Sequence, residues 1–458
     1  MIDGLRPYAD TNPTGLPWLG DVPAHWNVRR IKTLLREVDS RSKTGEERLL
    51  SLRMRQGLVD HIDAGGKLIP PESLVNFKIV EPGQVVMNRM RAAAGLFGVA
   101  NVRGLVSPDY AVFEPLPEAF NPYLLQAFRL PSLSAVFRAE SKGLGTGESG
   151  FLRLYTDRFG PIPVPYPPLD EQRLIVRFLD WHGAQTAKLI RAKKKIIALL
   201  NEQKQAIIHR AVTRGLDPNV RLKPSGIPWL GDIPEDWEVS RVKTEFQCLN
   251  YRRVPLSGTE RGRMTVRQYD YYGASGVIDK VDEFLFDDKL LLIAEDGANL
   301  VLRNLPLAII AEGKFWVNNH AHILKPRRGD IRFLAAILEG LNFLPWISGA
   351  AQPKLTQDRL MGIAIAVPPG HKQLEIIQSC DEEVSELVRA INVASKELIF
   401  IQEFRTRLIA DVVTGKLDVR AAAASLPESA ELEATEELVE DDDLDEAIDD
   451  AENKEVAA

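Results

Sequence analysis

One phrase occurs twice in the chain, and this duplication limits the folds that the chain can adopt. GLPWLGDVPAHWNVRRIKT spans residues 15–33, and GIPWLGDIPEDWEVSRVKT spans residues 226–244, which is 211 positions later. Self-similarity at a long, fixed offset indicates a duplicated structural unit. The chain is therefore predicted to contain two copies of one fold, and its function is expected to have two parts. The tryptophans that recur are Trp18 and Trp26 in the first copy and Trp229 and Trp237 in the second.

A second pair of similar segments follows at an offset of 201. The matched pairs are 154–162 with 355–363 (LYTDRFGPI and LTQDRLMGI), 165–175 with 366–376 (PYPPLDEQRLI and AVPPGHKQLEI), and 200–217 with 401–418. Because the offset changes between the two sets, the copies diverge in the sequence that lies between them. Similar ends around a different middle predict a shared scaffold that carries two different recognition surfaces. The repeated tryptophans are accordingly expected to pack within the scaffold.

Each copy divides into a compact module and a long helix. Apolar runs at 84–87, 110–113 and 290–293 are typical of buried strands, and 123–128 and 331–338 are typical of short helices. The stretch from about Glu171 to Arg214 has no proline and one glycine, and the stretch from about Lys372 to Thr414 has neither. Each stretch is therefore predicted to form one long helix, with Gly215 and Gly415 at the C-caps.

A 4-3-4-3 spacing predicts the face along which the two helices pack together. The first helix leads from the first module to the second, so a second helix that pairs with it must return, and the pair is expected to be antiparallel. About 44 residues would extend over ~65 Å, enough to hold two domains apart. The alternative is that each helix packs only on its own module. The stripe includes Ile175, Leu189 and Ile196 in the first helix, and Ile376, Cys380, Glu383, Glu397 and Phe404 in the second.

These features predict an α/β (α+β) fold with two globular recognition domains joined by a pair of long antiparallel coiled-coil helices, a pseudo-two-fold internal repeat. Duplex DNA has a similar two-fold axis, so two such modules could read two half-sites at a fixed separation. The predicted boundaries are an N-terminal extension at 1–13, a first domain at 14–168, a first spacer helix and linker at 169–224, a second domain at 225–368, a second spacer helix at 369–420 and an acidic tail at 421–458.

The net charge of −7 hides an uneven distribution. From Glu428 onward there are 15 acidic residues and one lysine, a net charge of −14, whereas residues 1–427 carry a net charge of +7. A mildly basic body is compatible with nucleic-acid binding, and equally with an ordinary solvated surface. The acidic tail has no aromatic residue and is expected to be largely disordered.

Composition also excludes several classes of protein. No apolar run approaches the ~20 residues that a membrane-spanning helix needs, so no membrane association is expected. The N-terminus lacks the basic and apolar pattern of a signal peptide. The two cysteines, Cys248 and Cys380, form neither a disulfide framework nor a metal-ligand pair. A reducing cytoplasm is therefore the expected location.

No convincing catalytic motif is present. The chain has no GxxxxGK[ST] phosphate-binding loop and no Asn/Asp-Pro-Pro-aromatic motif of amino-methyltransferases. The glycine-rich KGLGTG at 142–147 lacks the strand before it and the helix after it that phosphate binding requires. His320 and His322 would share a strand face, but no third zinc ligand is evident. We therefore expect no catalytic residue, no metal site and no cofactor in this chain.

Candidates for DNA contact come from basic and amide side chains near predicted strands and loops. In the first module, Asn88, Arg89 and Arg91 follow a predicted strand. For any one of these residues, the alternative is an ordinary surface charge or a loop hydrogen bond. The full set is Arg53, Arg55, Asn88, Arg89, Arg91, Lys142, Arg252, Arg253, Arg267, Gln268, Asn318, Asn319, His320 and Lys354.

With these motifs in order, residues 14–420 resemble the specificity subunit of type I restriction–modification enzymes. The markers are the paired PWLGDxPxxW phrases, PPLDEQ at the start of a long helix, VSPDYAVF (106–113), YYGASGVID (271–279), LLLIAEDGANL (290–300) and GKFWVNNHAHIL (313–324). The chain departs from the pattern at His371 and Lys372, where the first copy has Asp170 and Glu171. Because acidic residues favour a helix N-terminus, the start of the second helix is expected to be less firmly set.

The resemblance implies a non-catalytic subunit with two target-recognition domains, each of which binds half of a bipartite, asymmetric site on double-stranded DNA. It implies two methyltransferase subunits as partners, which bind S-adenosylmethionine and methylate adenine, and restriction/translocase subunits, which use ATP and Mg²⁺. The alternatives from other classes are a stand-alone nuclease or methyltransferase, and a coiled-coil adaptor or DNA mimic. A DNA mimic would spread acidic charge over its folded body, whereas here this charge is concentrated in the tail.

Overall fold

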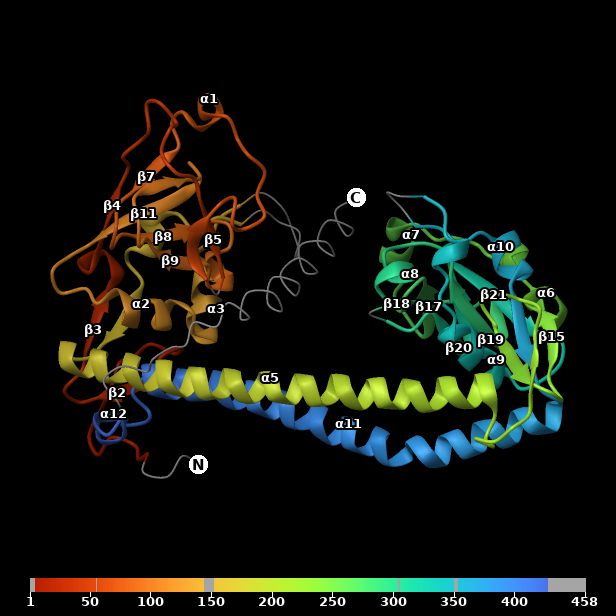
Figure 1. Cartoon of the computed structure of the whole chain (residues 1–458). Coiled ribbons are helices and arrows are strands. Elements are labelled where there is room, and N and C mark those ends of the chain that lie inside the picture. Colours follow the sequence, from red (N-terminus) through yellow and green to blue (C-terminus); the bar gives the residue numbers. More distant parts are fainter. Residues whose placement is uncertain (1–4, 55, 144–151, 304, 350–352, 427–458) are drawn as a thin grey trace. The chain divides into compact units, whose positions relative to one another are not determined.

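The computed structural model describes residues 5–54, 56–143, 152–303, 305–349 and 353–426 (Figure 1). The chain forms two compact units: unit 1 comprises Met1–Ala192 and Leu398–Ala458, and unit 2 comprises Lys193–Glu397. The acidic run from Glu428, most of the glycine-rich loop and the candidate Arg55 lie outside the described residues.

An antiparallel four-stranded sheet forms the centre of unit 1. Its order is β4 (Leu35–Val38), β11 (Tyr110–Pro115), β8 (Val85–Asn88) and β9 (Phe97–Val99). Strand β8 is buried along its whole length because alternate side chains enter two different cores. Val85 and Met87 join the core that includes the long helices, and Val86 joins a smaller core on the other face of the sheet. Two strand pairs complete this face, β5 (Leu50–Arg53) with β6 (Gly57–Asp60) and β7 (Lys78–Val80) with β10 (Gly104–Val106).

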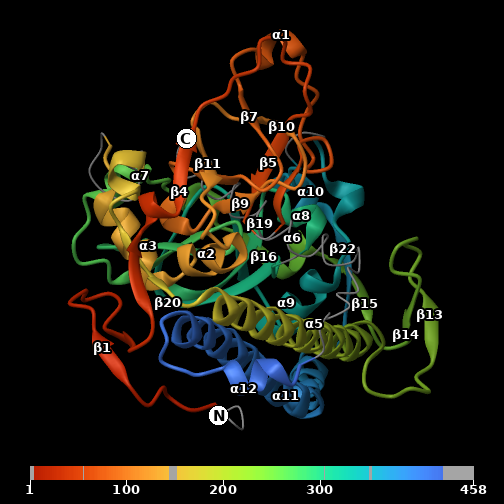
Figure 2. The ribbon, with the colours of Figure 1, turned by 90° about the vertical axis from the view of Figure 1, so that its left-hand side faces the viewer.

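Short helices cover the other face of this sheet. Figure 2 shows α2 (Asn121–Phe128) between the sheet and the first part of α5 (Leu169–Arg214), with α3 (Pro131–Glu140) beside α2. Four phenylalanines fill the space between these layers, and their ring centroids lie 5.0–6.2 Å apart. They are Phe97, Phe128, Phe137 and Phe159, all fully buried. Aromatic packing of this kind therefore fixes the sheet to the helical layer.

Unit 2 repeats this arrangement and extends it. Its sheet has the order β16 (Phe246–Cys248), β21 (Ala321–Pro326), β19 (Phe286–Ala294), β20 (Ala308–Val317), β17 (Tyr269–Gly273) and β18 (Gly276–Val281). The first four strands correspond to β4, β11, β8 and β9. Leu35 pairs with Pro115 in unit 1, and Phe246 pairs with Pro326 in unit 2, at the same offset of 211. The strands β17 and β18 have no counterpart in the four-stranded sheet of unit 1, so the middle of each repeat is where the units differ.

The repeated phrase forms the same scaffold in both units. In unit 1, β3 (Asn27–Arg30) pairs with β12 (Pro163–Tyr166), and in unit 2, β15 (Glu238–Arg241) pairs with β22 (Ala364–Val367) in the same register. Hairpins precede both pairs, β1 (Thr11–Pro13) with β2 (Asp21–Pro23) and β13 (Leu222–Pro224) with β14 (Asp232–Pro234). Trp26 and Trp237 are buried in the two cores and Trp18 packs against the first, whereas Trp229 is half exposed and contacts Trp346 edge-on.

Both long helices are single elements that contribute to both units. Helix α5 covers Leu169–Arg214 and α11 covers Gly370–Val413. Each begins after a Pro-Pro step, where a glutamine side chain donates back to a proline carbonyl (Gln172 to Pro167, Gln373 to Pro368). Each ends at a glycine with a φ of +77°, as predicted from the sequence.

The 4-3-4-3 spacing misassigned alternate positions of α5. Leu189 and Ile196, which it placed in the helix–helix seam, are 46% and 45% exposed. Their neighbours Ile190 and Ile197 are the less exposed side chains. A straight helix with 3.6 residues per turn drifts away from a strict 3.5-residue repeat, so the inner face moves by one residue along the stripe.

The same shift occurs in α11, where Val384 is buried and Glu383 is exposed. Glu383 instead accepts a hydrogen bond from Arg210 of α5, and Glu397 forms an ion pair with Lys193. As residue numbers rise along α5 between these two pairs, they fall along α11. The helices are therefore antiparallel within unit 2, as predicted, with ion pairs along the edge of their contact.

The remaining helices are short. They are α1 (Pro71–Leu74), α4 (Thr156–Phe159), α6 (Val242–Glu245), α7 (Gly258–Gly262), α8 (Asn299–Leu302), α9 (Ile331–Gly340), α10 (Gln357–Gly362) and α12 (Arg420–Ala424), with 3₁₀ turns at Ile31–Thr33, Ala92–Ala94, Asn250–Arg252 and Leu344–Trp346. Among the described residues, no helix has the length and apolar character needed to cross a membrane.

Candidate nucleic-acid interface

Three segments that are distant in the sequence meet at one edge of the unit 1 sheet. Strand β8 ends and β11 begins here, because Asn88 is paired with Tyr110. The amide of Leu154 donates to the carbonyl of Arg89 over 2.9 Å. Just before Leu154, Lys142 and Arg153 exchange two backbone hydrogen bonds of 2.9 and 2.8 Å. Lys142 and Arg153 are therefore paired with each other next to this sheet edge.

Three of the predicted DNA-contact residues of unit 1, Asn88, Arg91 and Arg53, lie close to Tyr110. Burial raises the pKa of Tyr110, while a hydrogen bond from Asn88 and the charges of Arg91 and Arg53 act in the opposite direction. The Asn88 side chain is buried and accepts from two backbone amides of the turn that follows it. Asn88 is thus better placed to shape the turn, and Arg91 is the exposed side chain of the group.

Two further cations at this edge bind carboxylates. Arg89 donates to Glu37 over 2.7 Å, and Arg153 donates to Asp109 over 3.3 Å. Arg89 is largely covered by its surroundings, whereas Arg153 is more open. Arg89 is therefore a framework residue of the edge, and the more exposed basic groups lie beside it.

Unit 2 has the equivalent edge. Strand β19 ends opposite the start of β21, because Ala294 is paired with Ala321. The amide of Leu355 donates to the carbonyl of Glu295 over 2.8 Å, as Leu154 does to Arg89. Ser348 and Lys354 exchange two backbone hydrogen bonds of 2.9 and 2.8 Å, as Lys142 and Arg153 do. The two sheet edges therefore have the same backbone construction.

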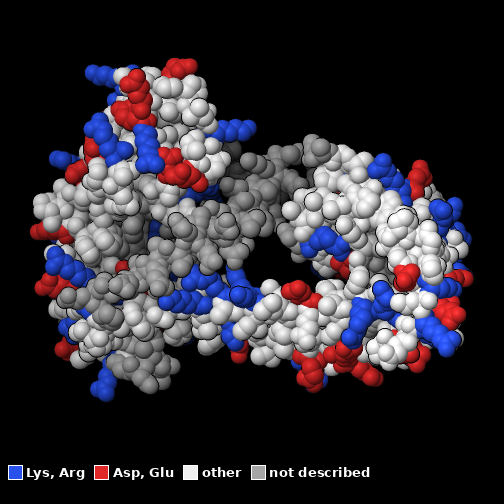
Figure 3. Space-filling model, in the orientation of Figure 1, with Lys and Arg blue, Asp and Glu red and all other residues white. Residues whose placement is uncertain are grey.

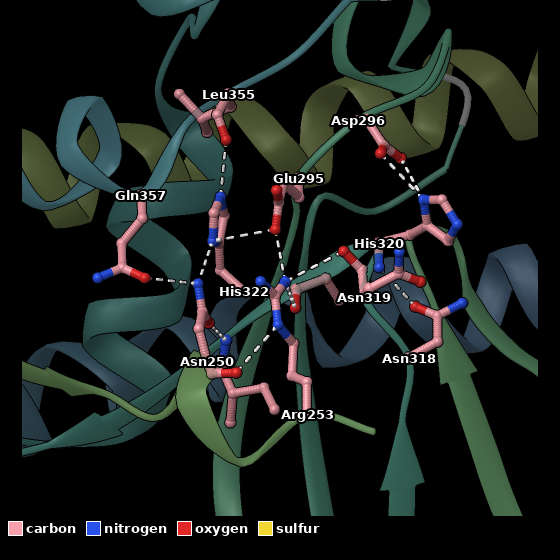
Figure 4. A network of polar contacts seen from close by, with 12 residues as sticks. Asn250, Arg253, Glu295, Asp296, Asn318, Asn319, His320, His322, Leu355 and Gln357 are labelled. Atoms are coloured by element: carbon pink, nitrogen blue, oxygen red, sulfur yellow. Dashed lines mark hydrogen bonds and ion pairs between the residues drawn. The ribbon is translucent and has the colours of Figure 1, made fainter. Parts of the chain in front are cut away.

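A polar network occupies this edge in unit 2 (Figure 4). Glu295 lies at its centre and is only 9% exposed. Arg253 binds one carboxylate oxygen, and Lys354 lies 3.2 Å from the other. Burial alone would raise the pKa of Glu295, but these cations lower it overall. One buried carboxylate thus holds two of the predicted DNA-contact residues, and Lys354 remains half exposed.

Behind Glu295 lies His322, which is fully buried. Its Nδ1 lies 2.8 Å from the Asn250 side-chain nitrogen, and its Nε2 lies 2.7 Å from the carbonyl oxygen of Leu355. The Asn250 oxygen already accepts from the amide of Ile323, so the Asn250 nitrogen faces His322 and donates. His322 is therefore neutral, with its hydrogen on Nε2, and burial lowers its pKa.

His320 faces the other way. Its Nδ1 lies 2.9 Å from both carboxylate oxygens of Asp296, and it is 45% exposed. The preceding Asn318 is buried and caps this turn, with its side-chain oxygen accepting from the amide of His320. The two histidines thus have separate partners, and no group of side chains able to hold a metal occurs in the described part of the chain.

The same backbone positions carry different chemistry in the two units. Arg89 of unit 1 corresponds to Glu295 of unit 2, because the carbonyl of each accepts a hydrogen bond from a leucine amide, that of Leu154 or Leu355. Asp109 of unit 1 corresponds to His320, at the offset of 211 that relates β11 to β21. A shared frame with different side chains is what recognition of two unlike partners or two unlike half-sites requires.

A family model described as the type I restriction modification DNA specificity domain matches residues 72–199 and 234–392, one stretch in each repeat and together more than half of the chain. The chain belongs to this family. As a member it is a DNA specificity subunit, which supplies recognition and not catalysis to a type I restriction–modification system.

Individual relatives agree with this family. A Haemophilus influenzae protein that carries the name of a type I restriction enzyme specificity subunit is 35% identical over 135 residues, which are 29% of this chain and 34% of that protein. The present chain thus matches about a third of the length of that relative. The type I restriction enzyme MjaVIII specificity subunit of Methanocaldococcus jannaschii is 24% identical over 326 residues, 65% of this chain and 70% of that protein.

A solved structure shares the fold. That structure is described as the structural basis of complex assembly and conformational transition of the type I R-M system. Its TM-score with the present chain is 0.58, at 14% sequence identity. The similarity covers 86% of this chain and 98% of that one. At this identity the similarity bears on the fold alone.

Several predicted contact residues of the specificity subunit lie away from the two edges. Arg252 lies over the ring of Phe286, at the opposite end of β19 from the network. Arg267 and Gln268 precede β17, and Arg267 is bound to Asp279 and Asp282. The structure therefore does not bring these three residues together with Lys354 and Arg253.

Sequence reasoning also missed residues that the network contains. Asn250, Glu295 and Gln357 were not among the candidates, although Asn250 donates to both His322 and Gln357. Two of them carried a signal. Glu295 follows the apolar run 290–293 by two positions, and Asn250 directly precedes the aromatic and basic run at 251–253.

Proposed function

We propose that the chain binds a bipartite, asymmetric site on double-stranded DNA, with one half-site read by each unit, and that it docks two methyltransferase subunits and restriction/translocase subunits. The partners would supply the chemistry: methyl transfer to adenine from S-adenosylmethionine, and ATP- and Mg²⁺-dependent cleavage. The observation that carries the proposal is the repeated sheet edge, which has one backbone construction and two different sets of side chains.

The charges at the edges fit this role. Lys354 and Arg153 stand at equivalent positions of the two loop bases, where a cation can reach a phosphate. The edge of unit 2 also offers the amides of Asn319 and Gln357, both exposed, and amides can read base edges in the major groove. We expect the two units to prefer different bases because their edges differ in donors and acceptors.

The two long helices carry the surface that we assign to protein partners. Beyond the first two turns of each helix, eight large apolar side chains are exposed, and exposed apolar surface marks sites of protein contact. Figure 3 shows lysines and arginines over the middle of α5 and acidic side chains along the first half of α11. A partner would thus meet apolar surface rimmed by charge. The exposed apolar residues are Leu189, Ile196, Leu199, Val388, Val393, Ile399, Phe400 and Phe404.

Methylome sequencing of the host with and without this gene tests the DNA-binding proposal. The expected result is an adenine methylation motif with two unequal halves and a fixed spacer that disappears when the gene is deleted. Replacing residues 45–150 with those of a relative should change one half of the motif and leave the other. A motif that survives the deletion, or that has a single continuous recognition sequence, would contradict the proposal.

Co-purification with the methyltransferase subunits tests the docking surface. Phe400 is 67% exposed on α11, and the change Phe400→Asp should greatly reduce recovery of the methyltransferase. Leu68→Asp is the matched control, because Leu68 is 87% exposed but lies outside the helices. Circular dichroism should show the same helix content in both variants. Full recovery with Phe400→Asp would remove this face of the helix from the proposal.

A further inference from the structure

Buried polar groups at the edge of unit 2 point to a residue that acts without touching DNA. His322 is fully buried, so its side chain cannot reach a ligand on the surface. It is nevertheless bound at both ring nitrogens, and both partners belong to segments that carry exposed polar groups (Figure 4). Such an arrangement is typical of a group that orients others.

The first partner of His322 is the base of the loop that ends at Lys354. The His322 Nε2–H donates to the carbonyl of Leu355, while the amide of Leu355 donates to the carbonyl of Glu295. Both backbone groups of Leu355 are therefore held, and Lys354 directly precedes it. Since the Lys354 ammonium also binds Glu295, its position depends on the histidine and the carboxylate together.

The second partner is Asn250. Its side-chain nitrogen donates to His322 Nδ1 over 2.8 Å and to Gln357 Oε1 over 3.0 Å, and its oxygen accepts from the amide of Ile323 over 2.9 Å. Gln357 is the first residue of α10 and is exposed. Asn250 thus links the orientation of the His322 ring to the position of the Gln357 side-chain amide at the surface.

We propose that His322 is a positioning residue that holds Lys354 and Gln357 in place for DNA recognition by unit 2, and that protonation of His322 releases them. This inference rests on the proposed function. The half-site of unit 2 is therefore read under pH control, whereas the half-site of unit 1 is not, because Ala111 takes the place of His322 in that unit.

The hydrogen-bond pattern explains why protonation is disruptive. A protonated His322 would carry a hydrogen on Nδ1, directed at the Asn250 nitrogen, so that two donors would face each other. Turning the Asn250 amide around would place its nitrogen against the amide of Ile323, which is also a donor. No local change of the asparagine therefore accommodates both bonds.

Burial also opposes protonation, while the surrounding charges are divided: Glu295 favours the imidazolium, and Arg253 and Lys354 oppose it. The charged groups that face His322 are Glu295, Arg253 and Lys354, and the Glu295 carboxylate lies 3.7 Å from Nδ1. The Glu295 carboxylate already binds two cations, Arg253 and Lys354. A third positive charge in the same buried place would have no carboxylate of its own, and burial, followed by the charges of the two cations, lowers the pKa of His322.

Selection from a random duplex pool tests the inference. The specificity subunit in complex with its methyltransferase subunits is equilibrated with a pool of duplexes at about pH 7.5 and about pH 5.5, at constant salt. At the higher pH, both halves of the site should be enriched. At the lower pH, enrichment of the unit 2 half should fall, by no more than about tenfold because the pKa of His322 lies below about 6.5, with the unit 1 half retained. Exchange of residues 45–150 identifies which half is which.

Two variants separate positioning from simple packing. In His322→Gln, the amide can still donate and accept but cannot titrate, so enrichment of the unit 2 half should no longer depend on pH. In Asn250→Asp, the carboxylate can accept a hydrogen bond from the protonated Nδ1, so two donors no longer face each other and acidification should no longer lower the enrichment of the unit 2 half. A purely structural role predicts that both variants weaken the unit 2 half equally at every pH.

The outcomes distinguish this inference from the proposed function. A two-part motif at the higher pH that fades in both halves together, or a wild-type pH response in His322→Gln, would overturn the inference alone. Absence of any two-part motif would overturn the proposed function. In that case, hydrogen exchange of residues 353–357 in the same complex decides the positioning role: it should accelerate on acidification in the wild type and not in His322→Gln.

Discussion

Lys372 donates to Asp236 over 2.7 Å, at the place where the first repeat has Glu171 and His25, also 2.7 Å apart. The carboxylate belongs to the helix in the first repeat and to the segment before the scaffold strand in the second. The sequence suggested that α11 would begin less firmly than α5, because His371 and Lys372 oppose the helix dipole. The structure shows that Lys372 has a partner, Asp236, which the sequence argument did not include. The hydrogen bond from Lys372 lowers the pKa of Asp236.

The first prediction concerns this ion pair. Lys372→Glu should loosen the first turn of α11, because the new carboxylate would face Asp236. The effect on overall stability should be small, since both side chains are more than 40% exposed. Hydrogen exchange of residues 370–376 should accelerate in the single variant and return to the wild-type rate when Asp236→Lys is added. Equal exchange in the single and double variants would show that the pair does not set the helix start.

The corresponding carboxylate in unit 1 gives a stronger prediction. Glu171 is 5% exposed, and it accepts a hydrogen bond from Tyr8 over 2.5 Å. Tyr8→Phe removes the donor and leaves a buried charged acceptor, so unfolding of unit 1 should become easier by about 1.5–3 kcal/mol. Tyr155→Phe is the control, because Tyr155 is 41% exposed. Denaturant titration of both variants checks the difference, and equal losses would refute it.

Much of the fold could be predicted from the repeat. The matched ends predicted a shared scaffold, though not its strands, and the limits of both long helices were predicted to within two residues because proline and glycine mark helix ends strongly. The inner face of the helices could not be predicted from the spacing. Ile196 and Ile197 are equally apolar in sequence, and only the drift of the helix against its partner decides which one is covered.

The candidate site was less accessible to sequence reasoning. Basic residues such as Lys354 could be identified because charge at a loop is visible in the sequence. Asn250 and His322 could not be joined, because they are 72 positions apart and meet only when β21 pairs with its neighbours. Arg252 was misleading for the same reason: its neighbour Arg253 enters the network, while Arg252 lies over an aromatic ring.

A prediction on pH follows from the two histidines whose pKa values are lowered by burial, His322 in unit 2 and His182 in unit 1. The unfolded chain binds protons near pH 6.5, whereas the folded histidines resist them, so stability falls as the pH drops below about 6.5. For the fully buried His322, the loss should approach about 1.4 kcal/mol per pH unit at most.

Thermal unfolding between about pH 7.5 and about pH 5 checks this dependence above the range in which carboxylates titrate. His322→Gln should flatten the pH response of unit 2 alone, and His182→Gln should flatten that of unit 1 alone, with hydrogen exchange assigning each loss to its unit. A response that persists unchanged in both variants would assign the dependence to other groups.

The glycines that end the two long helices provide a matched pair for a last prediction. Gly215 and Gly415 both have a φ of +77°, so an alanine at either position would be strained by about 1–2 kcal/mol. Their surroundings differ. A Cβ at Gly415 would lie 2.3 Å from Pro23 and 3.0 Å from Trp26, whereas a Cβ at Gly215 would meet only Trp237, at 3.7 Å. Gly415→Ala should therefore cost about 1–3 kcal/mol more than Gly215→Ala. Urea unfolding of the two variants measures this difference, and equal costs would show that the Pro23 side of the scaffold yields without penalty.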